Sequence, residues 1–364
     1  MSTNLKTIDD LITPVVLLDR VRLDKNIQAM QDVCNANGVQ LWPHIKTHKM
    51  VEVAKRQLAA GAQGLTCAKV GEAEEMMAAG PKRIFIAHSL VDVRVAPRLA
   101  ALADRLEELR VAVTSVLHAE ALVKVAQATD RPLKVVMAVD TGLHREGVRD
   151  IESAKKVVEI LAACPQLELA AIYTHEGQMY GSTVEEQLEK AQAIIDRMIE
   201  VRDAIDPALP LWPGCSVTAK IMAASGKVQV VRPGAYMFGD MSLAVSSRVM
   251  SADDVAVHIL ATVVDRPEPG LALIDAGTKV FSSDKSRSGL NGIAADGRDI
   301  QAFALNEEHG YLKGGDVDSL KIGDRIVIMP PHVCTVINLT DSVTVVEGDN
   351  VVDEWRVDAR GKVQ

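Results

Sequence analysis

The chain has 364 residues, of which 48% are hydrophobic and 24% charged. Its 40 basic and 49 acidic residues give a net charge of −9, and no basic block is present. This charge balance argues against nucleic acids and anionic membranes as partners. No apolar run approaches the roughly 20 residues that span a bilayer, and the segment Met1 to Lys6 lacks the apolar core of a signal peptide. The five cysteines are scattered and suggest no disulfide framework. We therefore expect a cytoplasmic protein. This length can hold one large α/β domain and a smaller one.

The first two thirds of the chain alternate between short apolar runs and segments with helical spacing, such as 72–79 and 184–205. The expected strands are 38–42, 64–68, 83–87, 111–115, 133–139, 167–173, 210–212 and 228–231. Eight strand–helix units predict a (β/α)8 barrel of the TIM type. An open doubly wound sheet is the alternative, and it fits less well because no Gly-x-Gly-x-x-Gly turn follows the first strand.

After about Ser247 the pattern changes to short strands separated by turns rich in Gly, Asp and Pro. The expected strands are 258–264, 271–275, 301–305, 324–329, 335–339, 343–347 and 351–357. This pattern predicts a separate, largely antiparallel β-domain. We therefore place the barrel at residues 13–247 and the C-terminal β-domain at residues 248–364, which the N-terminal residues 1–12 could join.

Lys46 lies between two histidines, His44 and His48, just after the first predicted strand. In a parallel barrel, the carboxyl ends of the strands carry the active site. A lysine held near apolar side chains loses its proton more readily than a solvated one, as the amine of a Schiff base must. Lys46 is therefore a candidate for covalent catalysis, and a surface lysine in a loop is the alternative.

Four further motifs follow in order along the chain. They are Asp140-Thr141-Gly142-Leu143-His144-Arg145-Glu146-Gly147 after the fifth strand, Tyr173-Thr174-His175-Glu176-Gly177-Gln178-Met179-Tyr180 after the sixth, the loops 213–220 and 232–240 after the seventh and eighth, and His332-Val333-Cys334. With Lys46, this set resembles the pyridoxal phosphate enzymes of the alanine racemase-like fold, over most of the chain. The nearest branch is the D-threonine aldolase and D-serine dehydratase group.

The resemblance implies that Lys46 binds the cofactor covalently and that Arg145 reaches its phenolic oxygen, where a guanidinium would stabilise negative charge. An Asp140–Arg145 ion pair that only tightens the loop is the structural alternative. His175 matches the position that packs near the cofactor ring, and Tyr180 is expected in the same pocket. Many relatives carry a second histidine where this chain has Gln178.

The cofactor's phosphate is expected in the loops after the seventh and eighth strands, where backbone N–H groups can hold it. The candidates are Ser216, Thr218, Gly234 and Ala235, with Tyr236 close by. Part of the family has a double glycine in the first of these loops, and this chain does not.

His332 and Cys334 are two residues apart, a spacing that would place both side chains on one face of a strand. Imidazole and thiolate together suit zinc and leave positions open for water and substrate, although His-x-Cys alone is more often structural. The family's metal site falls at this place. Asn306 to Gly310 also resembles a family segment, in which His309 is a metal neighbour or a proton donor, and a solvated turn is the alternative.

The resemblance therefore implies a lyase that uses pyridoxal 5'-phosphate and a divalent metal (zinc, manganese or magnesium) on small D-β-hydroxy-α-amino acids. We expect aldol cleavage to glycine and an aldehyde, as in D-threonine aldolase. Dehydration of D-serine or D-3-hydroxyaspartate is the alternative, because His-x-Cys is familiar from the dehydratases. A racemase would need a second base, for which the β-domain offers Tyr311 alone, and a non-catalytic cofactor carrier would lack the β-domain. A homodimer is expected.

Overall fold

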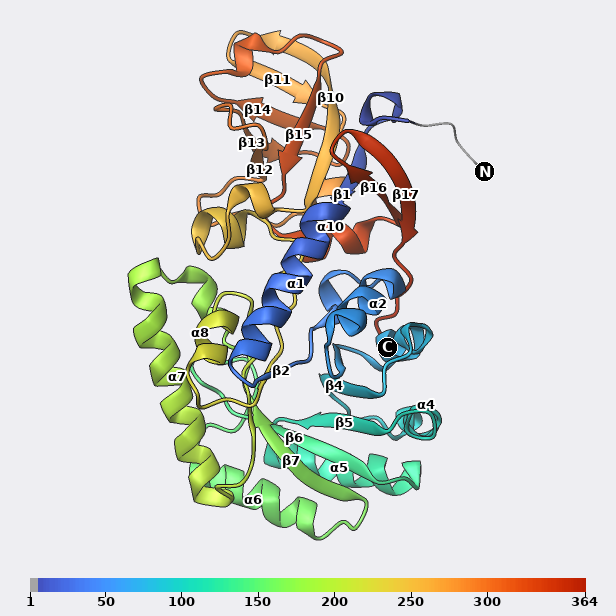
Figure 1. Ribbon diagram of the computed structural model, residues 1–364, viewed down its shortest axis with the longest axis vertical. Coiled ribbons are helices and arrows are strands. Elements are labelled where there is room, and N and C mark those ends of the chain that lie inside the picture. The colour runs from blue at the N-terminus through green and yellow to red at the C-terminus, as the bar shows by residue number, and fades with distance from the viewer. Residues whose placement is uncertain (1–5) are drawn as a thin grey trace. The chain divides into compact units, whose positions relative to one another are not determined.

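The computed structural model describes residues 6–364, which form two compact units that are each discontinuous in the chain (Figure 1). The first, called here the parallel unit, comprises residues 28–46, 51–234 and 361–364. The second, the antiparallel unit, comprises the described part of residues 1–27, residues 47–50 and residues 235–360. Across residues 6–364, no helix is both long enough and apolar enough to cross a membrane.

All eight strands expected in the first part of the chain are present within the described residues, and all belong to the parallel unit. Six form one parallel sheet in chain order, β3 (Leu65–Cys67), β4 (Arg83–Ser89), β5 (Glu108–Val113), β6 (Leu133–Ala138), β7 (Leu167–Tyr173) and β8 (Leu211–Trp212). The other two, β2 (Gln40–Leu41) and β9 (Val230–Val231), pair with each other in parallel. The predicted combination of a parallel α/β part with a later, largely antiparallel part is confirmed.

Backbone hydrogen bonds connect the β2–β9 pair to both edges of the six-stranded sheet. Thr66 N donates to Pro43 O beside β3, and Arg232 N donates to Pro213 O beside β8. Inside, side chains from successive strands pack into one core cluster: Trp42, Phe85, Ala112, Val136, Ala138, Ala171, Tyr173, Trp212 and Val230. The aromatic members supply much of its buried apolar area.

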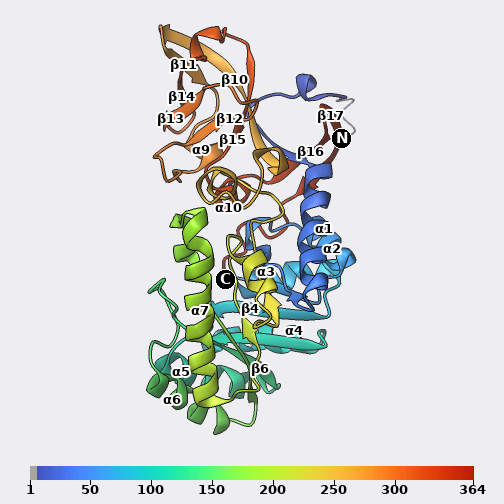
Figure 2. The same ribbon diagram turned by 60° about the vertical axis from the view of Figure 1, so that its left-hand side comes forward.

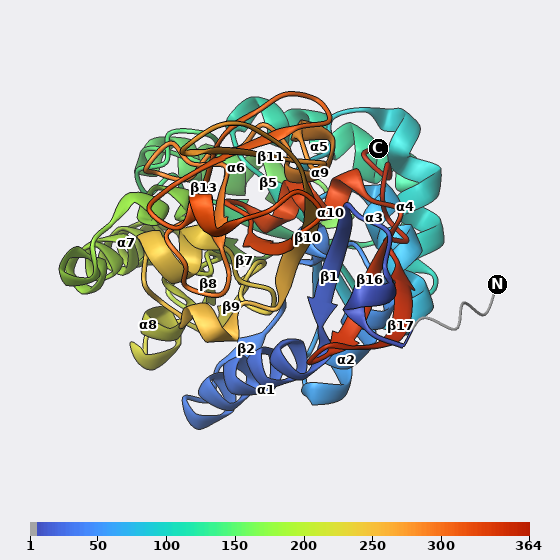
Figure 3. The same ribbon diagram turned by 90° about the horizontal axis from the view of Figure 1, so that it is seen from above.

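Helices cover the outer side of these strands (Figures 2 and 3). They are α2 (Val51–Ala60), α3 (Val70–Met76), α4 (Ala96–Ala103), α5 (Val116–Thr129), α6 (Ile151–Ala162), α7 (Val184–Ile205) and α8 (Ala219–Ala224), and α1 (Arg20–Ala36) begins in the other unit. In α6, Ala154, Val157 and Leu161 are buried at helical spacing. A capping box between Thr183 and Glu186 starts α7. Because the six strands of the sheet are parallel, their carboxyl ends lie at the same edge, and the loops that lead into the helices begin there.

The antiparallel unit contains a sheet of nine strands within the described residues, in the order β11-β14-β13-β12-β15-β10-β1-β16-β17, and β11 also pairs with β10. The strands are β1 (Val15–Asp19), β10 (Val257–Glu268), β11 (Leu271–Ile274), β12 (Gly292–Ala294), β13 (Gln301–Leu305), β14 (Gly310–Lys313), β15 (Arg325–Met329), β16 (Ser342–Glu347) and β17 (Asn350–Arg356). Strand β1 was not predicted, and it lies between β10 and β16 (Figure 3). Residues 6–8 also bond to the β16–β17 turn, while residues 1–5 lie outside the described part.

The strand predicted at residues 335–339 is wrong, because these residues lie in helix α10 (Val333–Leu339). The run of β-branched residues resembles a strand, yet Val333, Val336 and Ile337 are buried at helical spacing. The carboxylate of Asp240 accepts a hydrogen bond from Val333 N at 3.0 Å and so satisfies a free N–H at the start of the helix. The short helix α9 (Thr278–Phe281) packs in the same unit.

Strand β10 carries a buried histidine that predicts acid sensitivity. Burial, assisted by the positive charge of Arg22, lowers the pKa of His258 to about 4. The unfolded chain has a pKa near 6.5 at this residue, so as pH falls from about 6.5 to about 4 it takes up a proton that the folded chain does not. The free energy of unfolding should therefore fall across this window, by up to roughly 3 kcal/mol, and should not depend on His258 above it.

The His258→Gln variant tests this expectation, since its amide does not titrate. Urea unfolding measured between pH 7 and pH 4.5 should show a steeper loss of stability in the unmodified protein than in the variant. Parallel curves for the two proteins would contradict the assignment.

Candidate active site

Lys46 lies directly after β2, in the 3-10 turn η2 (Ile45–Thr47). The strand that carries it is held on both sides, since Trp42 N donates to Val231 O and Thr66 N donates to Pro43 O. The side chain of Lys46 is half-buried. The lysine is therefore at the carboxyl end of a parallel strand, as predicted.

His175 follows β7 and is held in one tautomer. Its Nδ1 lies 2.6 Å from the carbonyl oxygen of Gly214, and a carbonyl only accepts, so Nδ1 carries the proton and Nε2 is left with a lone pair. Burial, followed by the positive charge of Lys46, lowers the pKa of His175 to about 3, and Arg145 and Arg232 add to this effect. His175 is therefore neutral at physiological pH, and the charges that act on it place Lys46 and Arg145 in its neighbourhood.

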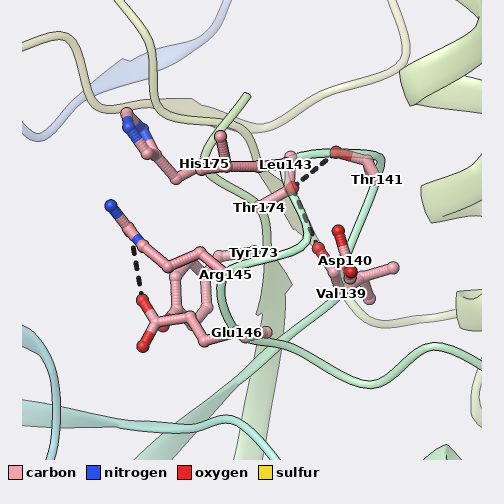
Figure 4. Close-up of a pocket in the computed structure, with 10 residues that line it drawn as sticks. Val139, Asp140, Thr141, Leu143, Arg145, Glu146, Tyr173, Thr174 and His175 are labelled. Carbon is pink, nitrogen blue, oxygen red and sulfur yellow. Dashed lines mark hydrogen bonds and ion pairs between the residues drawn. The ribbon is translucent and has the colours of Figure 1, made fainter. Parts of the chain in front are cut away.

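Arg145 lines a pocket at the ends of β6 and β7 together with His175 and Tyr173 (Figure 4). In this view the side chains of Arg145 and His175 extend toward the same side, and Arg145 pairs with Glu146 at 3.1 Å. Asp140 does not pair with Arg145: its carboxylate instead contacts His144 Nδ1 at 3.2 Å and Arg149 Nε at 3.1 Å. The Asp140–Arg145 alternative is therefore wrong, and the guanidinium of Arg145 remains half-exposed at the pocket.

The loops after β8 and β9 come together as predicted. Gly234 N donates to Ser216 Oγ at 3.2 Å. Thr218, in contrast, is fully buried, and its hydroxyl donates to Glu176 Oε1 at 2.9 Å. Glu176 also accepts from Gly214 N at 3.0 Å, and burial raises the pKa of this carboxyl. Glu176, which sequence reasoning missed, thus ties the His175 segment to the loop after β8.

The remaining ring-pocket and phosphate candidates are placed as follows. Tyr180 is half-buried in the turn η5 (Gly177–Gly181), and Gln178 Nε2 donates to Thr141 O at 3.0 Å. Ala235 and Tyr236 follow Gly234 in the chain but belong to the antiparallel unit, where both are buried.

His332 and Cys334 meet in the antiparallel unit, although not on a strand. His332 is the residue before helix α10, Cys334 lies in its first turn, and a hydrogen bond between their side chains raises the pKa of His332 to about 9. Asp284 Oδ2 lies 2.9 Å from His332 Nδ1. Cys334 Sγ lies 3.1 Å from the hydroxyl of Thr47, the residue that follows Lys46 in the chain.

His309 occupies the turn between β13 and β14, where it is exposed and its carbonyl accepts from Asn306 N at 2.9 Å. No hydrogen bond joins its side chain to His332 or Cys334. This placement agrees with the solvated-turn alternative, and its catalytic role stays a prediction.

The residues of the parallel unit fit an anionic aldehyde cofactor. The positive charges of Lys46, Arg145 and the fully buried Arg232 all act on His175, so an anionic ligand would offset a local excess of positive charge. Lys46 supplies the amine that an aldehyde requires. Arg232 packs directly against Gly214, since a Cβ there would lie 2.5 Å from the Arg232 guanidinium.

The residues of the antiparallel unit fit a divalent metal. The imidazole of His332 and the thiol of Cys334 are soft donors that suit zinc, and a carboxylate on the second ring nitrogen is the usual support for a metal-binding histidine. No group of three or more His, Cys, Asp or Glu residues within residues 6–364 is arranged as a complete metal site.

Comparison with known proteins shows the family of the chain. Residues 18–242 match the family described as alanine racemase, N-terminal domain, and residues 256–346 match the family described as putative serine dehydratase domain. The D-threo-3-hydroxyaspartate dehydratase of Delftia sp. (strain HT23) is 32% identical, over 98% of this chain and 98% of its own.

Two solved structures resemble the protein over nearly the whole chain. The D-threonine aldolase of Filomicrobium marinum gives a TM-score of 0.89 at 28% identity and covers 100% of both chains. A D-threo-3-hydroxyaspartate dehydratase with a cysteine replaced by alanine, solved in the metal-free form, gives 0.86 at 30% identity and covers 96% of this chain and 98% of its own. The chain therefore belongs to the alanine racemase-like family of lyases that includes the D-threonine aldolases and the D-threo-3-hydroxyaspartate and D-serine dehydratases.

Proposed function

We propose that the protein is a lyase that uses pyridoxal phosphate and a divalent metal to cleave D-β-hydroxy-α-amino acids into glycine and an aldehyde. One observation carries the proposal: the hydroxyl of Thr47, the neighbour of Lys46 in the chain, contacts Cys334, which is itself hydrogen-bonded to His332. The segment that contains Lys46 therefore continues in the chain into a residue that contacts the candidate metal-binding pair.

The proposed active site requires that the eight parallel strands β2 to β9 close into a complete barrel. The backbone bonds at both ends of the β2–β9 pair support closure of the eight parallel strands into a (β/α)8 arrangement. In such a barrel, Lys46, Arg145, His175, Ser216 and Gly234 would all lie at one rim, because each follows the carboxyl end of a strand.

When bound, pyridoxal phosphate would supply an electron sink for negative charge at the substrate's Cα. Lys46 would hold the cofactor through its amine. Neutral His175 would pack against the cofactor ring without adding positive charge there, since Nδ1 donates to Gly214. Arg145 would stabilise negative charge on the cofactor's phenolic oxygen. The loops at Ser216 and Gly234 would hold the phosphate, and Tyr236 follows the second loop in the chain.

A divalent cation on His332 and Cys334 would supply Lewis acidity, which makes a hydroxyl group more acidic. The two residues would thereby orient the substrate's β-hydroxyl, and deprotonation of that hydroxyl releases the aldehyde as the Cα–Cβ bond breaks. His309 is the proposed proton acceptor. These roles make both the His332–Cys334 pair and Lys46 necessary for turnover.

The test is product analysis on the purified protein loaded with pyridoxal phosphate and a divalent metal. D-Threonine should give acetaldehyde and glycine, and D-3-hydroxyaspartate should give glyoxylate and glycine. The L-isomers serve as controls and should give no product. Ammonia with a 2-oxo acid, and no aldehyde from any substrate, would overturn the aldolase proposal.

Dehydration is the second candidate, because the chain is 32% identical to a D-threo-3-hydroxyaspartate dehydratase and carries His-x-Cys, the pair familiar from the dehydratases. In that reaction Lys46 would take the Cα proton, the β-hydroxyl would leave as water, and hydrolysis would release ammonia and a 2-oxo acid. Pyruvate from D-serine or oxaloacetate from D-3-hydroxyaspartate would identify it. Racemisation has less support, since the phenol of Tyr311 donates to Asn306 at 2.6 Å. The homodimer stays a prediction.

A further inference from the structure

Asp284 makes contacts that the proposed chemistry does not yet use. Its Oδ2 lies 2.9 Å from His332 Nδ1 and also accepts a hydrogen bond from Thr335 Oγ1 at 2.9 Å. Asp284 is half-buried in the loop after α9, whereas His332 and Thr335 flank the start of α10. The carboxylate thus joins two segments that are far apart in the sequence.

Further hydrogen bonds fix the position of this carboxylate. Ser282 Oγ donates to Thr335 Oγ1 at 3.0 Å and accepts from Asp284 N at 3.1 Å. The side-chain amide of Asn291 donates to Asp284 O at 3.2 Å. Ser282 has a φ of 67°, a conformation rare for residues other than glycine. A loop held in this way keeps Asp284 in one place relative to the His332 ring.

His332 must give up one proton to bind a cation, and because a carboxylate oxygen can only accept a hydrogen bond, the contact with Asp284 keeps the remaining imidazole proton on Nδ1. Nε2 then has a free lone pair, and the ring cannot rotate without losing the Asp284 contact. Thr335 holds the same oxygen and also contacts His332 O at 3.2 Å, which ties the ring's support to its own backbone. The geometry selects one tautomer and one orientation.

We propose that Asp284 is a positioning residue that holds His332 ready to bind the divalent metal through Nε2. This inference rests on the metal site of the proposed function and adds the residue that fixes the orientation of the His332 ring. Carboxylates that orient metal-binding histidines in this way typically contribute about 10- to 100-fold to metal affinity.

The test measures metal affinity instead of activity. Chelator competition on the protein loaded with pyridoxal phosphate gives the dissociation constant of Zn²⁺ for the unmodified protein, Asp284→Ala and Asp284→Asn. Asp284→Ala should weaken binding by about 10- to 100-fold. Asp284→Asn keeps an oxygen that can accept from Nδ1 and loses only the charge, so its loss should be smaller.

Asp275→Asn is the matched control, because Asp275 is a half-buried carboxylate of the same unit that accepts from Thr13 Oγ1 at 2.5 Å and Thr262 N at 2.8 Å. It should bind Zn²⁺ as the unmodified protein does. Thermal unfolding without metal checks that each variant folds, and if Asp284→Ala does not, Asp284→Asn alone decides the test. Visible spectra with Co²⁺ should differ between Asp284→Ala and the unmodified protein.

Equal Zn²⁺ affinity in the unmodified protein and both Asp284 variants would overturn the positioning role. A loss in Asp284→Asn as complete as in His332→Ala would also overturn it, because Asp284 would then be a direct ligand. Failure of the unmodified protein to bind any divalent metal would instead refute the metal site of the proposed function, and so the two failures can be told apart.

Discussion

The Lys46→Ala variant is expected to be colourless and inactive after incubation with pyridoxal phosphate, whereas the unmodified protein should be yellow. The variant lacks the amine through which an aldehyde cofactor is held, and it also loses the group that would move a proton at Cα. A positioned proton-transfer group alone contributes about 10²- to 10⁴-fold, so turnover should fall by at least that factor. Visible absorbance and product formation measure the two effects.

Two variants separate the amine's chemistry from its charge. Lys46→Arg keeps the positive charge that acts on His175 but cannot hold an aldehyde covalently, so it should be as inactive as Lys46→Ala. Lys55→Ala removes an exposed lysine of α2 and should leave colour and activity unchanged. Borohydride reduction of the unmodified protein followed by peptide mass spectrometry should locate the cofactor on Lys46. A cofactor mass on any other lysine would refute the assignment.

The His332→Ala and Cys334→Ala variants should lose the metal and most of the activity while staying yellow. A bound cation stabilises developing charge by several kcal/mol, and since each 1.36 kcal/mol is tenfold in rate, turnover should fall about 10³-fold. Metal analysis after gel filtration and the rate with D-threonine or D-serine measure both effects. Chelation of the unmodified protein with EDTA should reproduce the loss.

The Cys334→Asp variant tests whether Cys334 acts as a metal ligand, because a carboxylate also binds metals and can replace the thiolate. This variant should regain metal and part of the activity that Cys334→Ala lacks. If His332→Ala and Cys334→Ala instead keep the unmodified protein's metal content and rate, the two residues do not bind the metal.

The parallel strands could be predicted because each is a short apolar run between segments of helical spacing. The runs at 167–173 and 83–87 coincide with β7 and the first part of β4. Strand β1 could not be found in this way, because its partners β10 and β16 lie far along the chain and a local pattern does not report them. The helix α10 was mistaken for a strand because Val333, Thr335, Val336 and Ile337 are all β-branched.

In the candidate site, too, some residues could be predicted from the local sequence and others could not. Lys46, Arg145 and His175 follow predicted strands within recognisable motifs, and the positive charges of Lys46 and Arg145 both act on neutral His175. Glu176, Asp240 and Asp284 were missed because each acts through contacts with residues distant in sequence. Glu176 lay within a quoted motif, but a buried carboxylate that accepts from backbone N–H groups leaves no spacing signature.

Strand β1 has a consequence for how the molecule is made. Val15–Asp19 leaves the ribosome long before its neighbours β10 and β16 are synthesised, so the nine-stranded sheet closes only when both ends of the polypeptide are available. A gene fragment that starts at residue 248 would leave β10 and β16 with unpaired edges, which are prone to aggregate. Residues 248–364 alone therefore do not form a complete sheet, and recombination could not transfer the antiparallel unit as one continuous gene segment.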